Sequence, residues 1–238
     1  NYVAQRYAWP LVLLDGHKCH VRVYALLTSD GRAFCHRQCF LHVANDPFET
    51  TSGDPVDSIH ITNCCVNSHD PDKFAGEICA NLDAKGCSGA GTDLVIGLAD
   101  YAASIHSSIA ALARSTFPFL RGGQANNGFE YLGLDFILSH RGDSPVAYLL
   151  EVNAPPSQDT ATGLSHAENV HDTVLRDLLS LWVYPHLISG ANEVPGGWRC
   201  VYEEEVADDS DLQPSKATIL NKIRWALFEK KKKKKKAA

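Results

Sequence analysis

Two pairs of segments along the chain alternate apolar and polar residues with the period of two that is typical of β-strands. The first pair covers residues 18–27 and 33–43, which are separated by the turn signal Ser29-Asp30-Gly31. The second pair covers residues 131–138 and 146–153, which are joined by a polar loop containing Gly142 and Pro145. We therefore predict two β-hairpins.

Other segments carry apolar residues at the spacing of an α-helix. The predicted helices cover residues 94–114, 165–187 and 215–229, and Pro118 lies beyond the expected end of the first. The stripes consist of Leu94, Leu98, Tyr101, Ile105, Ile109 and Leu112; of Val170, Val174, Leu178 and Trp182; and of Ile219, Ile223 and Leu227. We also expect a short strand or extended segment over 59–66 and a short helix within 70–82. This order of elements predicts an α+β fold with an antiparallel sheet flanked by helices.

Composition narrows the class of protein. The chain has 238 residues, of which 45% are hydrophobic and 21% charged, which suits one large domain or two small ones. Apolar runs are short, so we expect no membrane span. The eight cysteines are scattered, which indicates reduced thiols in a cytoplasmic protein. The chain opens at Asn1 in strand-like sequence and contains no Met, so we expect the N-terminal part of the fold to be missing.

Charge is unevenly distributed. The formal net charge is −6, but Lys230 to Lys236 form a run of seven lysines, and the remainder carries 15 basic and 28 acidic residues. We expect residues 230–238 to form a disordered tail, which is either merely solvated or attracted to an acidic surface. The acidic body argues against general nucleic-acid binding.

Two carboxylates in the second hairpin are the strongest chemical signal. Asp135 lies in an apolar strand on the face opposite Leu134 and Phe136. In the partner strand, Glu151 and Asn153 share one face. Carboxylate and amide oxygens are hard ligands that suit Mg²⁺ bridging nucleotide phosphates. The alternative is a solvated face, but ionised carboxylates are costly to bury in such apolar strands without partners.

Three further groups of residues could carry chemistry. Lys18, His20 and Arg22 project from one strand face and suit phosphate or carboxylate groups, unless that face is simply exposed. Thr62 and Asn63 form a weaker signal, because turn capping is their default role. The cluster Cys35, His36, Cys39 and His42 resembles a zinc site. A strand points Cys35 and His36 to opposite faces, which argues against zinc.

These segments together resemble the tubulin-tyrosine-ligase-like family of ATP-grasp ligases. Five segments match family motifs in order, from about residue 3 to residue 157. They are Gln5-Arg6-Tyr7 with Asp15-Gly16-x-Lys18; Lys18-Cys-His-Val-Arg22-Val-Tyr24, which is similar to K-F-D-x-R-x-Y; His60-Ile-Thr-Asn63, similar to H-L-T-N; Phe129 to Asp135, similar to F-x-x-x-G-x-D; and Leu150-Glu-Val-Asn-Ala-Pro155, similar to L-x-E-V-N-x-x-P.

The resemblance implies an ATP-grasp fold that uses ATP and Mg²⁺. By family position, the adenine hinge would be Gln5, Arg6, Tyr7 and Ala8. Lys18, His20, Thr62 and Asn63 would contact the nucleotide. Arg22 and Glu151 would act in catalysis, and Asp135, Glu151 and Asn153 would hold Mg²⁺. We expect residues 1–189 to be the C-terminal portion of the ligase domain, followed by an acidic linker over 190–214, the helix 215–229 and the lysine tail.

Two departures from the family pattern bear on activity. The family's Asp two residues after the lysine is His20 here. The Arg of the next family strand has no secure counterpart: Phe34 falls near its place, and Arg37 is a candidate substitute. The family's phosphate-gripping lysines would lie before Asn1.

The resemblance implies an ATP-dependent ligase that adds glutamate, glycine or tyrosine to a protein carboxylate through an acyl phosphate. The expected partners are a free amino acid and tubulin or another protein with an acidic tail, and the expected location is the cytoplasm, with microtubule association. Two alternatives stay open. One is a truncated or degenerate ATP-grasp module that binds a partner without turnover. The other is a ligase acting on a small molecule or another protein.

Overall fold

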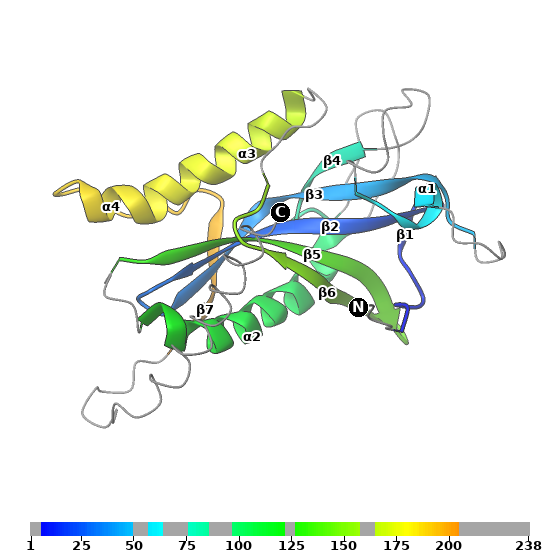
Figure 1. Cartoon of the computed structure of the whole chain (residues 1–238), viewed down its shortest axis with the longest axis horizontal. Coiled ribbons are helices and arrows are strands. Elements are labelled where there is room, and N and C mark those ends of the chain that lie inside the picture. The colour runs from blue at the N-terminus through cyan, green and yellow to red at the C-terminus, as the bar shows by residue number, and fades with distance from the viewer. Residues whose placement is uncertain are drawn as a thin grey trace, which may run out of the picture.

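A single antiparallel sheet with helices on both faces organises the part of the chain that the computed structural model describes. The described residues are 6–49, 57–63, 76–85, 97–121, 127–157 and 165–204. The long strands run in the order β4-β3-β2-β5-β6, with β1 paired to β2 and β7 paired to β3. Figure 1 shows the sheet lying between α2 on one side and α3 with α4 on the other. The predicted α+β class is confirmed.

Both predicted hairpins are present. The first consists of β2 (His17–Thr28) and β3 (Arg32–Pro47), and the second consists of β5 (Phe129–Arg141) and β6 (Ser144–Asn153). Both pairs are antiparallel, and β2 also pairs with β5, so the two hairpins form one continuous sheet. The alternation in these segments therefore correctly identified the strands and their pairing into hairpins.

The shorter elements correct three sequence-based expectations. The segment expected to hold a helix contains strand β4 (Gly76–Asn81), because its backbone pairs with the edge of β3. The strand or extended segment expected over 59–66 overlaps the one-turn helix α1 (Asp57–His60), residues 61–63 form no strand, and residues 64–66 lie outside the described residues. The expected linker over 190–214 contains strand β7 (Trp198–Glu203), which pairs with β3. β1 (Leu13–Leu14) completes the sheet. Pairing with a long neighbouring strand outweighed local propensity in two of these cases.

Helix α2 (Ala102–Arg121) covers one face of the sheet, and the 3₁₀ turn η1 (Leu98–Asp100) precedes it. The predicted stripe is confirmed at Leu98, Tyr101, Ile105 and Ile109, which are buried in the larger hydrophobic core. The expected end before Pro118 is wrong, because Pro118 lies inside the helix. The apolar residues Phe117 and Leu120 on either side pack onto the core, which favours continuing the helix despite the lost hydrogen bond.

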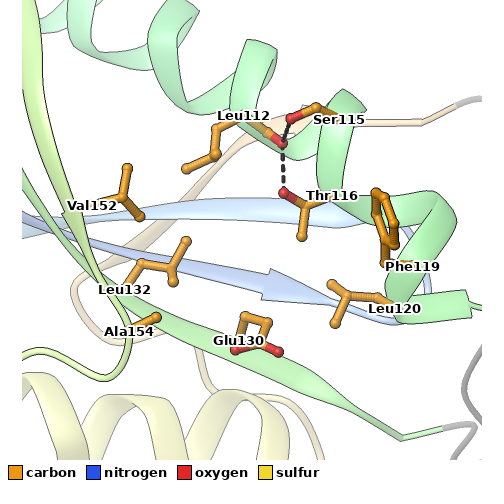
Figure 2. A pocket seen from close by; sticks show the side chains of 9 residues that line it. All are labelled: Leu112, Ser115, Thr116, Phe119, Leu120, Glu130, Leu132, Val152 and Ala154. Carbon is orange, nitrogen blue, oxygen red and sulfur yellow. Dashed lines mark hydrogen bonds between the residues drawn. The ribbon is translucent and has the colours of Figure 1, made fainter. Parts of the chain in front are cut away.

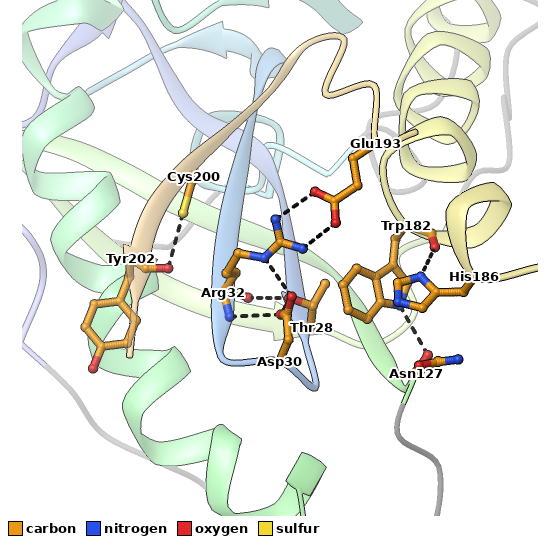
Figure 3. Close-up of polar contacts among 9 residues, drawn as sticks. All are labelled: Thr28, Asp30, Arg32, Asn127, Trp182, His186, Glu193, Cys200 and Tyr202. Atoms are coloured by element: carbon orange, nitrogen blue, oxygen red, sulfur yellow. Dashed lines mark hydrogen bonds and ion pairs between the residues drawn. The ribbon is translucent and has the colours of Figure 1, made fainter. Parts of the chain in front are cut away.

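The opposite face is covered by α3 (Ser165–Leu178), a π-helical segment η2 (Leu179–Val183) and α4 (Tyr184–Leu187). All four predicted stripe residues are buried in a second core beneath these helices. A polar network in Figure 3 attaches the segment that follows α4 to the first hairpin: Arg32 donates to Asp30 and to both carboxylate oxygens of Glu193, the latter at 2.8 Å. This face is therefore closed over Tyr24 and Phe40.

The predicted helix 215–229 and the lysine tail lie outside the described residues. Among the helices that the structure describes, we find none with the length and apolar character needed to cross a membrane.

Candidate active site

One row of polar side chains crosses three neighbouring strands. Arg22 on β2 pairs in register with Asp135 on β5, and Asp135 pairs in register with Glu151 on β6. Residues directly opposite one another in an antiparallel pair project to the same face. Asn153 lies two residues beyond Glu151 and shares this face. The structure therefore brings together the three residues predicted to hold a cation.

A β-bulge at Leu150 creates this alignment. From the hairpin turn to the pair Phe136–Leu149, β5 and β6 pair in one regular register. One residue earlier on β5, Asp135 faces Glu151, so β6 contributes an extra residue at that point. Without the extra residue, Asp135 would face Leu150 and Glu151 would turn toward α2. The bulge thus decides which face carries the second carboxylate.

The Asp135 carboxylate is already engaged by protein. Arg22 donates from Nε to Oδ1 and from Nη2 to Oδ2, the latter at 2.8 Å. Asn153 Nδ2 also donates to Oδ2 at 3.4 Å. Glu151 is exposed and makes no hydrogen bond or ion pair to any residue that the structure describes. The row offers a free carboxylate beside a carboxylate that is neutralised by arginine.

Two histidines extend the row toward the start of β2. The rings of His20 and His42 stack with their centroids 4.5 Å apart, and His20 Nδ1 lies 2.5 Å from the hydroxyl oxygen of Thr62. His20 Nε2 lies 3.6 Å from Asp135 Oδ1. Thr62 is buried, so its segment is docked on β2 rather than merely capping a turn.

Both imidazoles are neutral near pH 7. Burial away from water, helped by the charges of Arg22 and Lys18, lowers the pKa of His20 from 6.5 to about 3. Burial, with His20 and Arg22 as further causes, lowers the pKa of His42 to about 3. The position that carries an Asp in the related motif is therefore uncharged in this chain.

A hollow of about 880 Å³ adjoins this row at the other side of Lys18. Its walls include Arg6, Tyr7, Ala8, Lys18, Ile137, Leu149 and Leu150. Lys18 Nζ donates to the carbonyl of His60 at 2.7 Å and lies 4.9 Å from the centre of the Tyr7 ring. The predicted hinge residues and Lys18 are thus brought together, except that Gln5 lies outside the described residues.

The absence of a side chain at Gly133 makes room for the aliphatic part of Arg22. A Cβ atom at Gly133 would lie 2.7 Å from Pro156 Cβ and 3.2 Å from Arg22 Cδ. Glycine therefore leaves the space in which the arginine crosses β5 to reach Asp135. Neither Gly133 nor Pro156 was singled out from the sequence as a site residue.

Other sequence-based candidates lie apart from the row. Arg37 is exposed, and Phe34 is buried under α3 with Trp198. The residues opposite His20 and Arg22 on β3 are His42 and Phe40. Asn63 is exposed at the end of the docked segment. Among the described residues, no group of three His, Cys, Asp or Glu side chains forms a metal cluster, so the cysteines of β3 are not assembled for zinc.

The donor set fits a hard divalent cation next to a phosphate. Asp135, Glu151 and Asn153 supply oxygen atoms on one face, and Arg22 and Lys18 supply positive charge beside them. The adjacent hollow is lined by aromatic and aliphatic side chains that suit a planar ring and by basic side chains such as Arg6 and Arg141. Such a site can bind a nucleotide and stabilise negative charge that develops during phosphoryl transfer.

Comparison with known proteins supports this interpretation. Residues 1–190 match the sequence profile of the tubulin-tyrosine ligase family. The chain is 28% identical over 203 residues to human tubulin polyglutamylase TTLL13, an alignment covering 76% of this chain and 24% of that protein. It is 28% identical over 217 residues to the probable tubulin polyglutamylase TTLL9 of Bos taurus, covering 86% and 43%.

A more distant relative comes from yeast. The chain is 25% identical over 178 residues to a probable tubulin–tyrosine ligase of Schizosaccharomyces pombe, which covers 74% of this chain and 41% of that protein. The chain thus spans between about a quarter and somewhat under half of the length of these relatives.

Proposed function

Since the chain belongs to the tubulin-tyrosine ligase family, we propose that it forms part of an ATP-dependent ligase that joins an amino acid to a protein carboxylate. The observation that carries this proposal is the row Arg22, Asp135 and Glu151, which crosses three strands beside a hollow lined by both apolar and basic side chains. We infer tubulin as the acceptor, because the relatives are named tubulin polyglutamylases and a tubulin–tyrosine ligase. A cytoplasmic, microtubule-associated location follows from that acceptor.

The proposed reaction has two steps. The acceptor carboxylate attacks the γ-phosphorus of ATP, so that ADP leaves and an acyl phosphate forms. The amino group of the free amino acid then attacks the acyl carbon, forms the amide bond and releases phosphate. The protein's task is to position these groups and to neutralise negative charge. Glutamate, glycine and tyrosine all remain candidate amino acids.

The residues of this chain have distinct roles in the proposal. Glu151, Asp135 and Asn153 would hold Mg²⁺, which neutralises phosphate charge when bound. Arg22 would orient the phosphate or the reacting carboxylate with its two-pronged guanidinium. Lys18 and residues 6–8 would bind the nucleotide from the hollow. His20 lies beside Thr62 and Asp135, so its neutral ring would make a polar rather than a charged contact to the nucleotide.

Ligation assays on the full-length protein test this function. Wild type and Glu151→Gln are incubated with ATP, Mg²⁺, each candidate amino acid and a peptide that ends in an acidic tail. We expect Glu151→Gln to lose at least about tenfold in rate, because one cation ligand loses its charge. Glu203→Gln on β7, an exposed acid far from the row, is the matched control and should retain full activity. Equal rates for all three proteins would exclude the assignment.

One observation favours a second candidate, a binding module without turnover. Arg22 occupies both oxygens of Asp135, and the neighbouring His20 and His42 are buried and neutral. In that case the row is a structural ion pair and the fold serves to bind a partner. Absence of ATP-dependent ligation together with retained binding of tubulin by Glu151→Gln would favour this alternative.

A further inference from the structure

An apolar groove lies on the face of the sheet opposite the Arg22–Asp135 row. It runs between the C-terminal half of α2 and the strands β5 and β6, and its volume is about 310 Å³. Figure 2 shows Leu112, Ser115 and Phe119 on the helix side, with Leu132, Glu130 and Val152 on the strand side. The groove is thus separate from the candidate nucleotide site, although β5 and β6 contribute residues to both.

The walls of the groove are mainly apolar and partly exposed to solvent. The side chains of Phe119 and Val152 are 41% and 40% exposed. The volume equals that of about ten waters at roughly 30 Å³ each, and few polar groups are present to bind them. Covering these walls with an apolar partner would therefore be favourable. Glu130 is the one charged side chain among the described residues that line the groove.

We propose that residues 215–229 of this same chain bind in the groove as a helix. In that segment, Ile219, Ile223 and Leu227 recur at helical spacing and form one apolar stripe. At 100° per residue, Lys216 falls between Ile223 and Leu227 on the stripe, and Lys222 and Arg224 lie about 60° beyond its two edges. A helix that places the stripe in the groove brings one of these cations to Glu130.

The course of the chain favours this occupant. The described part ends at Glu204, whose N–H donates to the carbonyl of Gly31 in the turn between β2 and β3 at 2.9 Å. Ser29 in the same turn donates to the carbonyl of Gly128, two residues before Glu130. The ring of Tyr202 stacks on Phe117 of α2. The chain therefore leaves β7 beside α2, at the end of the sheet where β5 begins.

The length of the connection is sufficient. Residues 205–214 span up to roughly 33 Å when extended, which is enough to pass the end of α2. A helix over residues 215–229 is about 22 Å long, which exceeds the roughly 13 Å of α2 between Leu112 and Leu120 that lines the groove, so only part of it would lie in the groove. The first described residues lie at the other end of β5, where Val12 donates to the carbonyl of Leu138. The segment that follows β7 is thus better placed than the segment that precedes β1.

Accessibility of a groove residue in the full chain tests the proposal. Ser115 is exposed and lines the groove, so Ser115→Cys introduces a near-isosteric thiol there. The rate of alkylation by iodoacetamide at position 115 is followed by peptide mass spectrometry in three full chains. The first carries Ser115→Cys alone, the second combines it with Ile223→Asp, and the third combines it with Phe228→Asp. Phe228 falls on the side of the predicted helix away from the stripe, so it is a matched control with the same change in charge.

We expect alkylation to be at least about tenfold faster with Ile223→Asp than with Ser115→Cys alone, and unchanged with Phe228→Asp. Glu130→Lys should also accelerate alkylation, and adding Lys222→Glu and Arg224→Glu to Glu130→Lys should slow it again. Equal rates in all chains would overturn the proposal. A slow rate that appears only as the protein concentration rises would assign the groove to a second copy and would also overturn it.

Discussion

Arg22 binds both carboxylate oxygens of Asp135 across the pairing of β2 with β5. The side chains are only 17% and 8% exposed, so this pair is held largely away from water. A buried pair of this kind is costly to break, because the partner that remains keeps its charge. The same pair lies at the centre of the candidate active site, so we expect both stability and function to depend on these two residues.

Removing the cation from this pair should destabilise the protein. We expect Arg22→Met to lower the free energy of unfolding by about 3 kcal/mol, since it preserves the length of the side chain but leaves Asp135 buried beside only the Asn153 amide and the neutral His20 ring. The measurement is urea denaturation at pH 7. Arg199→Met is the control: Arg199 pairs with Asp83 at the surface, where both side chains are at least 40% exposed, and its loss should cost under about 1 kcal/mol. Equal costs would contradict a buried role for Arg22.

Stability should fall in acid because of the stacked histidines. In the unfolded chain a histidine binds a proton below about pH 6.5, whereas burial holds the pKa of His42 near 3 in the folded protein. The unfolded state therefore binds more protons between these values, and stability decreases as the pH is lowered from 6.5 toward 3. Above pH 7 this contribution is complete and constant.

The variant His42→Phe isolates this effect. Replacing a titrating ring with a non-titrating one should reduce the acid-side slope of the unfolding free energy by up to about 1.4 kcal/mol per pH unit. Urea denaturation at pH 8, 7, 6 and 5 provides the measurement. The difference between wild type and His42→Phe should be constant from pH 8 to 7 and should shift in favour of the variant below 6. A constant difference at every pH would mean that His42 is not held neutral.

The space above Gly133 should be essential for the position of Arg22. Gly133→Ala would place a methyl group 2.7 Å from Pro156 Cβ, and we expect a loss of about 1–3 kcal/mol in unfolding free energy. Pro156→Gly removes the nearer obstacle, so the double variant should recover part of the loss relative to the two single changes. Thermal and urea unfolding of the four proteins check this coupling. Strict additivity would show that the two residues do not compete for the same space.

Thiol reactivity should divide the described cysteines into two groups. Cys19, Cys35 and Cys39 are buried, and burial raises the pKa of the Cys19 and Cys35 thiols to about 12. Cys79 and Cys200 are exposed. We expect iodoacetamide at pH 8 to label the exposed pair in the native protein and to label all five described cysteines only after denaturation. Rapid labelling of Cys35 in the native state would contradict its place in the core.

The sequence was sufficient to predict the strands of both hairpins, because alternating segments with one buried face have a distinct pattern. It was not sufficient to predict which residues face each other. Counting from the turn, Leu27 pairs with Ala33, and a regular ladder would place Phe40 opposite His20. Two additional residues in β3 between Cys35 and Cys39 bring His42 there instead. Irregularities of this kind have no clear local signature, so the histidine stack could not be predicted.

The same limit applied to the carboxylates. A regular second hairpin would have separated Asp135 and Glu151 onto different faces, and only the bulge at Leu150 brings them together. The resemblance to a ligase family identified them as partners, whereas alternation alone gave only the possibility of a shared face. Strands β4 and β7 were missed for a different reason: each is short and depends on pairing with β3 rather than on its own pattern.

Binding of Mg-ATP is the most direct test of the account, because Glu151 is the predicted cation ligand with no other partner among the described residues. Titration calorimetry compares the full-length wild-type protein with Glu151→Gln and with the control Glu203→Gln. We expect Mg-ATP to bind wild type and Glu203→Gln alike, and to bind Glu151→Gln at least about tenfold more weakly, with little difference between them when Mg²⁺ is removed. Undiminished binding of Mg-ATP by Glu151→Gln would contradict the central claim.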